Sequence, residues 1–425
     1  MAEGARYCFI VRWLDPTSAL IWKYQFFYNT ADSSIEMYDI KNQKIFLKRV
    51  SHPEIRLEHL YIGGTFVLYS RQLVVEDYGD DFTRKELSNL QETTIAVIKP
   101  DAIDNVGKII DIIYSNGFLV KQMRMCKLSS QQAAQFYKAH AGKHFFGHIT
   151  SHMSSGPCVA LELVAEDAIS KWRLLLGPTD SVEAKVKAPS SIRAEFGSDE
   201  TRNACHGSDS PSAAKQESDF FFKDKSLGFC AKLKHCTLCL IKPHAVFDGN
   251  RLLSRFTKAN LDAGTTGFAG IIIDAILKRF VITAMELVTF GRPSALDFYE
   301  LYNGVCSDYH VSILAFDLMT SASFCMQAMA QELSVGPFIA MEVCYESGDD
   351  NPVNDFRDFC GPPDAAMCKA LRPSTLRAQY GINKVKNAIH CTDLPEDGVT
   401  ECTYVFTHKF NPTQEATVYK NHNLR

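Results

Sequence analysis

The side chains best suited to chemistry occur twice in this chain, in the same order. RNACHGSD, which contains Asn203 and His206, recurs as KNAIHCTD. Two arginines, Arg173 and Arg193, precede His206, and Lys99 lies further upstream. Guanidinium groups match phosphate oxygens bidentately, so these cations predict a site for a polyanion. A neutral histidine among them can attack phosphorus and form a phosphoramidate.

The second copy keeps these residues in register. Three pairs are each 184 residues apart: Arg173 and Arg357, Arg193 and Arg377, and His206 and His390. The lysines Lys99 and Lys242 are only 143 residues apart. Lys242 precedes Gly336 by 94 residues, whereas Lys99 precedes Gly156 by 57, so the second copy carries 37 extra residues in this part, at 250–266 and around 311–325. A lone histidine is most often a core residue, but recurrence at a constant separation favours a functional site. No P-loop or protein-kinase motif accompanies it.

Cys236 and Cys239 are the only two cysteines at the spacing of a redox or zinc motif. They lie in HCTLCLI, an apolar run typical of a strand, where residues three apart face opposite sides. No second CxxC accompanies them, so we interpret them as buried strand thiols. The 14 cysteines form no regular framework, which favours reduced thiols in the cytosol over secreted disulfides.

Length and composition predict a soluble protein of about three domains. The chain has 425 residues, at about 150 per domain. Hydrophobic residues make up 46% and charged residues 22%, as in globular proteins. A net charge of -4 argues against a nucleic-acid partner. No apolar run approaches the ~20 residues that span a bilayer, and the first residues lack a secretory signal, so no membrane partner is expected.

Hydrophobic periodicity predicts strands and helices in each copy. In the first copy, TIAVIKP, FLVKQMRMCKL and CVALELVA are β-rich, whereas VGKIIDIIYSNGF, SSQQAAQFYKAH and AEDAISKWRLLLG have helical spacing. We interpret them as a β-α-β-β-α-β order, an α+β ferredoxin-like fold with helices on one face of an antiparallel sheet. The expected units are residues 1–88, 91–220 and 235–407.

Each copy resembles the nucleoside diphosphate kinase family. RNACHGSDS carries the resemblance most specifically, because it is similar to that family's active-site signature N-x-x-H-G-S-D. The resemblance implies a ping-pong reaction, in which a nucleoside triphosphate phosphorylates the histidine and the phosphohistidine passes the group to a nucleoside diphosphate. It also implies Mg²⁺ bridging the phosphates without dedicated protein ligands.

Carried over by position, the resemblance implies roles in the first copy. His206 would be the phosphorylated nucleophile and Glu217 would hydrogen-bond its ring. Lys99 would contact the sugar hydroxyls and the transferring phosphate, and Asn203 the ribose 3′-hydroxyl. The remaining residues would bind phosphate, base or the histidine itself: Arg173, Thr179 and Arg193 the phosphates, Phe145 the base, and Tyr137 the histidine and lysine.

The second copy matches the family less completely. The matching residues are Lys242, Tyr299, Arg357, Arg377, Asn387, His390 and Glu401. However, Pro363 replaces the phosphate-binding threonine, Cys391 replaces the glycine after the histidine, and Tyr309 is the nearest candidate to stack on a base. Losing one hydroxyl donor to phosphate costs roughly 1.5–3 kcal/mol. An active second copy and a degenerate, mainly structural one both remain open.

The segment before the two copies resembles a DM10 domain, a small β-rich, PH-like unit. SSIEMYDIKNQKIFLKR and SRQLVVEDYGD carry this resemblance, and turn residues separate short strands along the whole segment. DM10 domains occur in proteins of cilia and flagella. The resemblance therefore implies attachment to microtubules or their associated proteins.

Two functions are compatible with this organisation. The first is an enzyme, a nucleoside diphosphate kinase held at the cytoskeleton of a cilium or flagellum, on its axoneme, or at the centrosome. Its partners would be nucleoside di- and triphosphates together with tubulin or axonemal proteins. The second is a mainly structural microtubule-associated protein that uses the kinase folds as docking surfaces. Two linked kinase units could also pair within one chain, which would permit a monomer.

Overall fold

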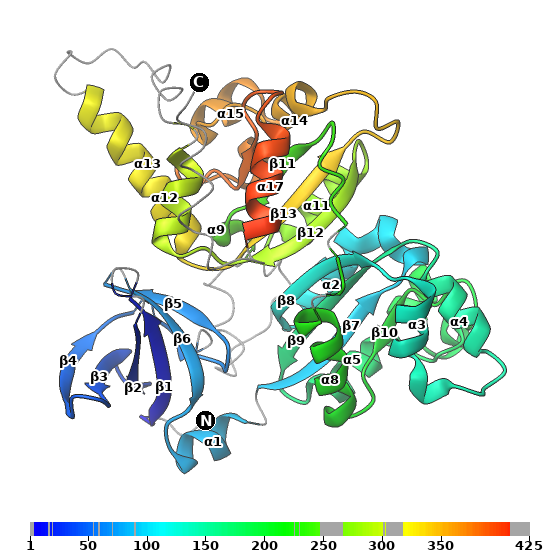
Figure 1. Cartoon of the computed structure of the whole chain (residues 1–425), viewed down its shortest axis with the longest axis horizontal. Helices are drawn as coiled ribbons and strands as arrows, with labels where there is room; N and C mark the ends of the chain where they lie inside the picture. Colours follow the sequence, from blue (N-terminus) through cyan, green and yellow to red (C-terminus); the bar gives the residue numbers. More distant parts are fainter. Residues whose placement is uncertain are drawn as a thin grey trace.

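A computed structural model describes most of the chain (Figure 1). The described residues are 4–408 without 16–17, 19, 54, 58–59, 70, 89–90, 225, 229, 247–266, 301 and 303–317. The side chains of 318–325 are also outside the description. Tyr309 and most of the extra sequence of the second copy therefore lie outside the described residues.

The N-terminal unit is a six-stranded antiparallel sheet followed by a short helix. The sheet has the order β4-β3-β2-β1-β6-β5. Its elements are β1 (Arg6–Leu14), β2 (Ile21–Asn29), β3 (Ser34–Asp39), β4 (Lys44–Ser51), β5 (Thr65–Leu68), β6 (Arg71–Tyr78) and α1 (Asp81–Leu87). Tyr7, Phe9, Phe26 and Leu73 are buried in one core, because alternate residues of each strand face inward. The predicted small β-rich, PH-like unit is confirmed.

The first kinase copy contains a four-stranded sheet in the order β10-β7-β9-β8, with every neighbouring pair antiparallel. Its strands are β7 (Glu92–Ile98), β8 (Leu119–Lys127), β9 (Pro157–Ala165) and β10 (Cys205–Gly207). Its α-helices are α2 (Val106–Ser115), α3 (Ser130–Phe136), α4 (Phe146–Met153), α5 (Ala168–Leu176), α6 (Ser181–Lys187), α7 (Ile192–Phe196) and α8 (Pro211–Ser218). This order of strands confirms the ferredoxin-like fold.

Helices cover both faces of this sheet, so the prediction of one covered face was wrong. Ala96 and Ile98 face a core that includes α2 and α5. Ile95 and Val97 face a second core with Tyr137, after α3, and residues of α4. The sequence already carried the signal, because β7 is a continuous apolar run. Such a run is typical of a strand that is buried on both sides.

The second copy repeats the same sheet in the order β12-β13-β11-β14. Its strands are β11 (Thr237–Ile241), β12 (Val281–Val288), β13 (Phe338–Cys344) and β14 (Ile389–Cys391). Its helices are α9 (Pro243–Val246), α11 (Ala269–Leu277), α12 (Arg292–Glu300), α13 (Leu318–Ser334), α14 (Val353–Cys360), α15 (Ala365–Leu371), α16 (Leu376–Tyr380) and α17 (Gly398–His408). Part of the extra sequence, 318–325, lies in α13.

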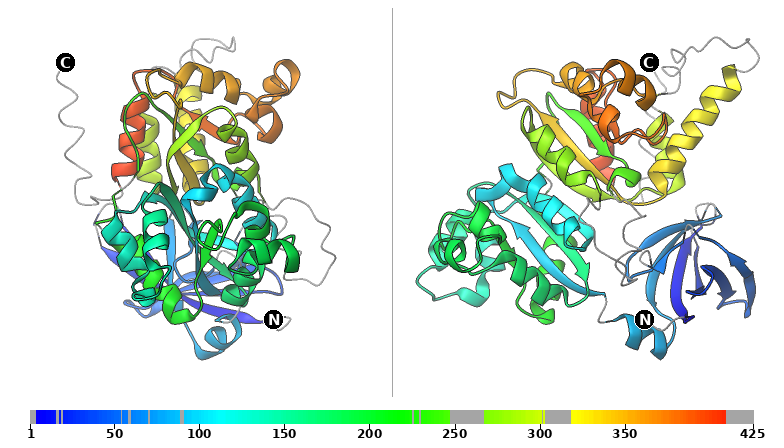
Figure 2. Two further views of the ribbon diagram at one scale, coloured as in Figure 1. Left: turned by 90° about the vertical axis from the view of Figure 1, so that its right-hand side faces the viewer. Right: turned by 180° about the vertical axis from the view of Figure 1, so that it is seen from behind.

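The two kinase copies pair within the chain (Figure 2). β8 joins β12 at Arg124 and Glu286, so the two sheets form one eight-stranded sheet. α2 and α11 pack against each other at Gly107 and Gly270, where a Cβ on Gly107 would lie 2.4 Å from the Asp274 nitrogen. Two glycines are needed here because the backbones approach too closely for any side chain.

The N-terminal sheet contacts the second copy as well as leading into the first. The Gln72 side-chain amide donates to the carbonyl of Phe290, which follows β12, at 3.0 Å. Among the described residues no helix is both long and apolar enough to cross a bilayer.

Candidate active site

A pocket of about 840 Å³ opens in the first kinase copy. Its walls come from the end of α3, the start of α4, α5, β10 and α8. All the residues predicted for the first site line it: Lys99, Tyr137, Phe145, Arg173, Thr179, Arg193, Asn203, His206 and Glu217. The fold therefore brings together residues that are spread over more than a hundred positions of sequence.

His206 is held by a carboxylate on one side of its ring. Its Nε2 lies 3.0 Å from Glu217 Oε1, and Ser208 donates its hydroxyl to Glu217 Oε2 at 2.6 Å. Because an ionised carboxylate only accepts hydrogen bonds, Nε2 carries the proton and Nδ1 keeps a lone pair. The rings of Phe136 and Tyr137 lie close to perpendicular to the imidazole, with centroids 5.2 and 6.0 Å away. This geometry leaves Nδ1 as the nucleophilic atom.

The backbone that presents His206 is strained and is secured by side chains that the sequence analysis missed. Ala204 has a left-handed φ of 64°. Its N–H donates to Asp101 Oδ2 at 2.9 Å, and Asp101 Oδ1 lies 2.8 Å from His152 Nε2. Burial raises the pKa of the Asp101 carboxyl, but the bonds from His152 and Ala204 outweigh it and hold that pKa below its usual value. Trp172 Nε1 also donates to the His206 carbonyl at 3.2 Å.

Lys99 is a buried cation directly beside the nucleophile strand. It is 3% exposed, and its Nζ donates to Asn203 Oδ1 at 2.7 Å and to the Thr201 carbonyl at 3.0 Å. Burial lowers the pKa of Lys99 to about 8. Asn203 is fixed in turn, because its Nδ2 donates to the Thr179 carbonyl at 2.8 Å. Lys99 and Asn203 therefore reach the pocket in one defined orientation.

Two arginines make the pocket electropositive. Arg193 Nη1 donates to the Gly177 carbonyl at 2.9 Å and Nη2 to the Cys205 carbonyl at 3.2 Å. Its buried Nε has no hydrogen-bond partner among the described residues. Burial, with a smaller effect from Arg173, lowers the pKa of Arg193. An anionic ligand would relieve the repulsion between the arginines.

The second copy reproduces the frame of this site. His390 Nε2 lies 3.2 Å from Glu401 Oε2, and Lys242 Nζ donates to the Val385 carbonyl at 2.8 Å. Asn387 Nδ2 donates to the Pro363 carbonyl at 3.0 Å, so this contact survives the loss of the threonine because it uses the backbone. Ala388, like Ala204, has a positive φ. The predicted residues of the second site are therefore brought together.

In the second site the histidine and both arginines make further contacts within the chain. Tyr302 OH lies 3.2 Å from His390 Nε2 and also donates to Glu401 Oε1. Arg377 Nη2 donates to Cys391 Sγ at 3.4 Å, and Arg357 Nη2 lies 3.5 Å from an Asp393 carboxylate oxygen. The His390 side chain is 9% exposed, against 20% for His206. These contacts close the second site around its histidine.

Cys391 fits beside His390 because a neighbouring aromatic residue is smaller. In the first copy a Cβ on Gly207 would lie 2.6 Å from Trp172 Cδ1, so only glycine is accommodated. The second copy has Phe356 at the position of Trp172, and Cys391 at the position of Gly207. The thiol is buried among Cys360, Arg377 and His390, and hydrogen bonding with Cys360 lowers the pKa of Cys391 to about 6.

The second copy also carries the Asp101–His152 pair with its two residue types exchanged. His244 stands at the position of Asp101 and Glu332 near the position of His152. His244 Nδ1 lies 2.5 Å from Glu332 Oε1, and His244 Nε2 accepts from the Ala388 N–H at 3.1 Å. An acid and a histidine therefore secure the strained alanine in both copies.

Family comparisons agree with this geometry. The profile of the nucleoside diphosphate kinase family matches residues 92–227 and 261–410. The profile of the nucleoside diphosphate kinase 7 N-terminal PH domain matches residues 1–89. The chain therefore belongs to the nucleoside diphosphate kinase family.

The arrangement of all three units is similar to that of one particular relative. Nucleoside diphosphate kinase homolog 7 of Rattus norvegicus is 40% identical over 409 residues, which are 95% of this chain and 93% of the relative. The nucleoside diphosphate kinase of Aquifex aeolicus is 45% identical over 133 residues, which are 31% of this chain and 94% of the relative. A crystal structure of the Aquifex protein has 43% identity and a TM-score of 0.31, and covers 32% of this chain and 99% of that chain.

Proposed function

We propose that the first kinase copy transfers the γ-phosphate of a nucleoside triphosphate to a nucleoside diphosphate through a phosphohistidine at His206. One observation supports this proposal above the others. His206, oriented by Glu217, shares a single pocket with Lys99, Arg173 and Arg193. A nucleophile with a lone pair and three cations around it suit attack on a polyphosphate.

The reaction takes place in two balanced displacements. His206 Nδ1 attacks the γ-phosphorus, and the N–P bond forms as the bond to the bridging oxygen breaks and the nucleoside diphosphate leaves. A terminal phosphate oxygen of a second nucleoside diphosphate then attacks the same phosphorus, and the N–P bond breaks. Glu217 stabilises the positive charge that develops on the imidazole while the proton stays on Nε2. Lys99, Arg173 and Arg193 stabilise the charge on the transferring group.

Binding of Mg²⁺ fits this proposal through the nucleotide. Asp209 and Glu200 line the pocket. Within the described residues, however, no three metal-ligating side chains gather there. The phosphates and water would therefore supply most of the ligands, with the two carboxylates as outer partners. When bound, the ion neutralises phosphate charge.

Phosphate transfer from ATP to GDP tests the catalytic proposal. The full chain is incubated with γ-labelled ATP and then with GDP. We expect transient label on the protein and formation of labelled GTP, both of which the His206→Gln variant loses. The His390→Gln variant is the matched control and is expected to retain both. Absence of transfer by the folded wild-type chain, or full transfer by His206→Gln, would contradict the proposal.

A second, structural role is favoured for the second kinase copy. Tyr302 contacts its histidine, Arg357 lies 3.5 Å from the Asp393 carboxylate, and Arg377 donates to the Cys391 thiol where the first copy has glycine. This copy would then serve as a pairing and docking surface. Label on His390 in the His206→Gln variant, at the stoichiometry of wild type, would refute this assignment.

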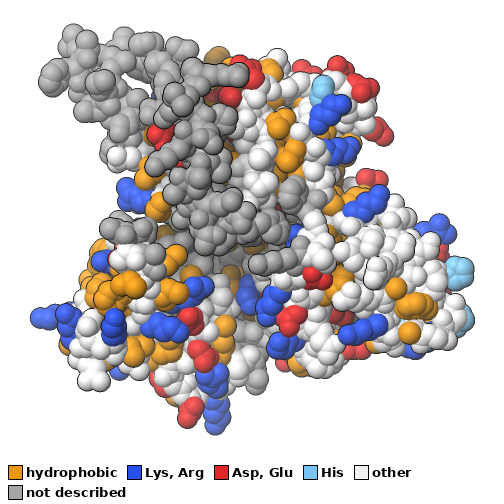
Figure 3. Space-filling model, viewed as in Figure 1, with side chains coloured by type: hydrophobic (Ala, Val, Ile, Leu, Met, Phe, Trp, Pro, Cys, Tyr) orange, Lys and Arg blue, Asp and Glu red, His pale blue; other side chains and the backbone are white. Residues whose placement is uncertain are grey.

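The N-terminal unit is proposed to attach the enzyme to microtubules or axonemal proteins of a cilium, flagellum or centrosome. An apolar surface supports this proposal (Figure 3). Leu14, Ile21 and Ile45 are each more than half exposed. Such a surface suits a protein partner with apolar residues.

Co-sedimentation with microtubules tests the attachment. The Ile21→Glu/Ile45→Glu variant of the full chain is expected to remain in the supernatant while its phosphotransfer activity is unchanged. Val186→Glu alters a still more exposed apolar residue of the first kinase copy and is expected to sediment like wild type. Unchanged sedimentation after deletion of residues 1–88 would exclude the N-terminal unit as the attachment site.

A further inference from the structure

Two buried carboxylates occupy the same position in the two kinase copies. Glu162 lies on β9 and Glu342 on β13, in the aligned segments SSGPCVALEL and SVGPFIAMEV. Glu162 is 5% exposed and Glu342 is fully buried. In the first copy the charge is balanced, because Lys121 Nζ lies 3.1 Å from Glu162 Oε1. Burial of a carboxylate without a cation would cost several kcal/mol.

The second copy lacks this lysine. Both strands that pair with the glutamates contain a bulge, and the bulge residue is Lys121 in β8 but Thr283 in β12. Thr283 Oγ1 donates to Glu342 Oε2 at 2.5 Å, and the Lys232 and Leu233 N–H groups donate to Oε2 and Oε1, both at 2.7 Å. These donors are neutral groups. Within the described residues no cationic side chain forms an ion pair with Glu342.

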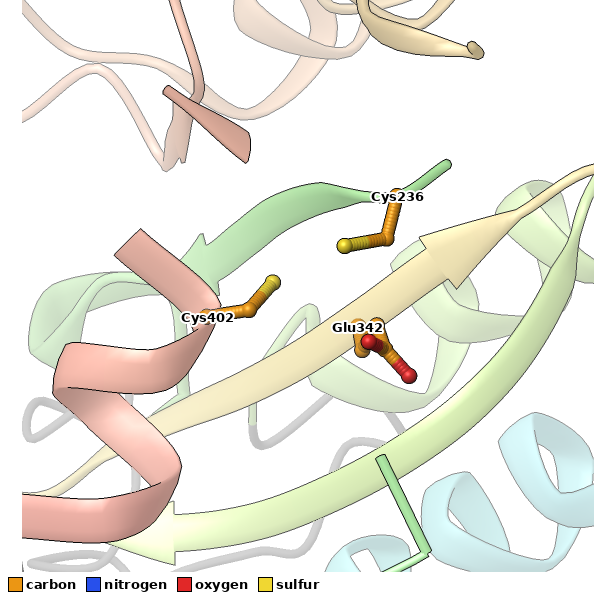
Figure 4. A group of neighbouring side chains, drawn as sticks. All are labelled: Cys236, Glu342 and Cys402. Carbon is orange, nitrogen blue, oxygen red and sulfur yellow. The ribbon is translucent and has the colours of Figure 1, made fainter. Parts of the chain in front are cut away.

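Two thiols take the place of hydroxyl groups around the unpaired carboxylate (Figure 4). Ser218, which donates to Glu162 Oε2 at 3.3 Å, corresponds to Cys402 of α17, and Thr93 corresponds to Cys236 before β11. The two sulfurs and a Glu342 oxygen lie within 4.8 Å of one another. Both thiols are buried, at 1% and 0% exposure. Two sulfurs and a carboxylate oxygen thus gather at a glutamate that has no cationic partner among the described residues.

We propose that Cys236, Glu342 and Cys402 bind a zinc ion. Thiolates combined with a carboxylate select zinc among the common divalent ions, and the ion would supply the positive charge that Lys121 supplies in the first copy. From the described residues Glu342 Oε1 accepts one hydrogen bond, which leaves a lone pair for a metal. The bonds from Thr283 and Leu233 orient the carboxylate as outer partners of a metal ligand do.

Cys344 lies near these three residues but is not one of the proposed ligands. Cys344 lies on the same face of β13 as Glu342, two residues further on, and its Sγ is 3.5 Å from Thr283 Oγ1. Cys239, the other half of the CxxC pair, faces the opposite core together with Ile241. Cys236 and Cys239 are therefore buried in opposite cores, as predicted, although Cys236 lies just before β11. The proposed ligands come from three separate segments instead.

A zinc ion at this position would fasten three elements of the second copy. Cys236 follows Leu233 and His235, which both have positive φ values. Cys402 is adjacent to Glu401, which holds His390. The ion would therefore tie the strained entry of β11 and the helix behind His390 to the central strand. This role is structural and independent of phosphate transfer.

Metal content of the full chain tests the site. Because the ligands are buried, zinc must enter during folding, so the protein is produced in zinc-supplemented cells and freed of loose metal by gel filtration. We expect one zinc per chain. Cobalt supplied in place of zinc is expected to give thiolate-to-metal absorption. The Cys236→Ser/Cys402→Ser variant is expected to lose both signals, and Cys239→Ser is the matched control that keeps them.

Thr283→Lys provides an independent test that removes no ligand. It introduces the lysine of the first copy, and we expect a folded chain with its original phosphotransfer activity but without zinc. A folded wild-type chain without zinc would overturn the proposal. Retention of zinc by both altered chains, or a Cys236–Cys402 disulfide found by mass spectrometry, would also overturn it. If the double serine variant does not fold, the Thr283→Lys result decides.

Discussion

Exchanging the two members of the Asp101–His152 pair is expected to preserve the first active site. Asp101→His/His152→Glu copies the arrangement of His244 and Glu332 in the second copy. In that arrangement the histidine Nε2 accepts from the alanine N–H and its Nδ1 donates to the glutamate. The strained Ala204 would therefore keep an acceptor, and His206 would keep its position.

The cost of each single change follows from the contacts that it removes. Asp101 accepts from His152 at 2.8 Å and from the Ala204 N–H at 2.9 Å, and each side chain of the pair is 12% exposed. Hydrogen bonds to charged groups contribute about 1.5–3 kcal/mol each. Asp101→His alone places two histidines together, and His152→Glu alone places two acids together. We expect each to lose about 2–3 kcal/mol of unfolding free energy, and the double variant to regain at least half of the combined loss.

Urea unfolding followed by Trp172 fluorescence measures these differences. The chain has three tryptophans, and Trp13→Phe/Trp22→Phe leaves Trp172 as the reporter of the first kinase copy. The double-mutant cycle gives the coupling energy of the pair. Losses that simply add, with a coupling below about 0.5 kcal/mol, would refute the idea that the two arrangements are equivalent. Loss of phosphotransfer by a stable double variant would refute the positioning role.

The pH dependence of stability offers a second check on the same pair. Burial alone would raise the pKa of Asp101 in the folded chain, but the hydrogen bonds from His152 and Ala204 outweigh this effect and lower it. A group whose pKa is lower in the folded chain stabilises the fold at pH values above its unfolded pKa, which is about 4 for aspartate. This stabilisation disappears as the pH falls through the folded pKa. Wild type is therefore expected to lose stability in acid, relative to Asp101→Asn, only below about pH 4.

Three further predictions follow from the site and the helix pair. Burial lowers the pKa of Lys99 to about 8, so kcat/KM is expected to fall as pH rises through 8, and a Lys99→Arg profile without that decline would confirm the assignment. Glu217→Gln replaces a charge-assisted bond of about 1.5–3 kcal/mol, so phosphorylation of His206 in a single-turnover assay is expected to slow by roughly 10- to 150-fold; an unchanged rate would contradict its role. Gly107→Val places side-chain atoms against the backbone of α11 and is expected to lower unfolding free energy by about 1–3 kcal/mol or more, whereas Gly147→Ala, which meets open space, serves as control.

Much of the fold and of the first site could be predicted because the chain repeats its own pattern. The constant separation of the arginines and histidines identified a site before any element was placed. The strands were predicted from apolar β-rich runs, and β7 to β9 lie where those runs are. It was less predictable that helices cover both faces of the sheet, because the second face of β7 is covered by α3 and α4, which lie later in the chain.

The contacts that close the second site could not be read from the sequence. Tyr302 has no aligned tyrosine in the first copy, because His140 stands at the corresponding position. The bond from Arg377 to Cys391 depends on the smaller Phe356, a compensation visible only when the packing is known. The Asp101–His152 pair did have a signal, since aligning the copies reveals the exchange with His244 and Glu332.

The residues of the family signature serve two purposes, shaping the turn that presents the histidine and binding phosphate, and the two copies differ in the second. Both sites share a lysine bonded to a backbone carbonyl, an asparagine amide bonded to a backbone carbonyl, a histidine–glutamate pair, and a strained alanine with its acid–histidine support. This frame therefore builds the turn that presents the histidine, whether or not a nucleotide binds. The difference lies in the arginines. Arg193 donates to two carbonyls and its Nε has no partner within the described part of the chain, whereas Arg377 also donates to Cys391 through Nη2 and to the Ile389 carbonyl through Nε. Availability of the guanidinium donors, rather than the presence of the N-x-x-H motif, should decide which copy binds phosphate.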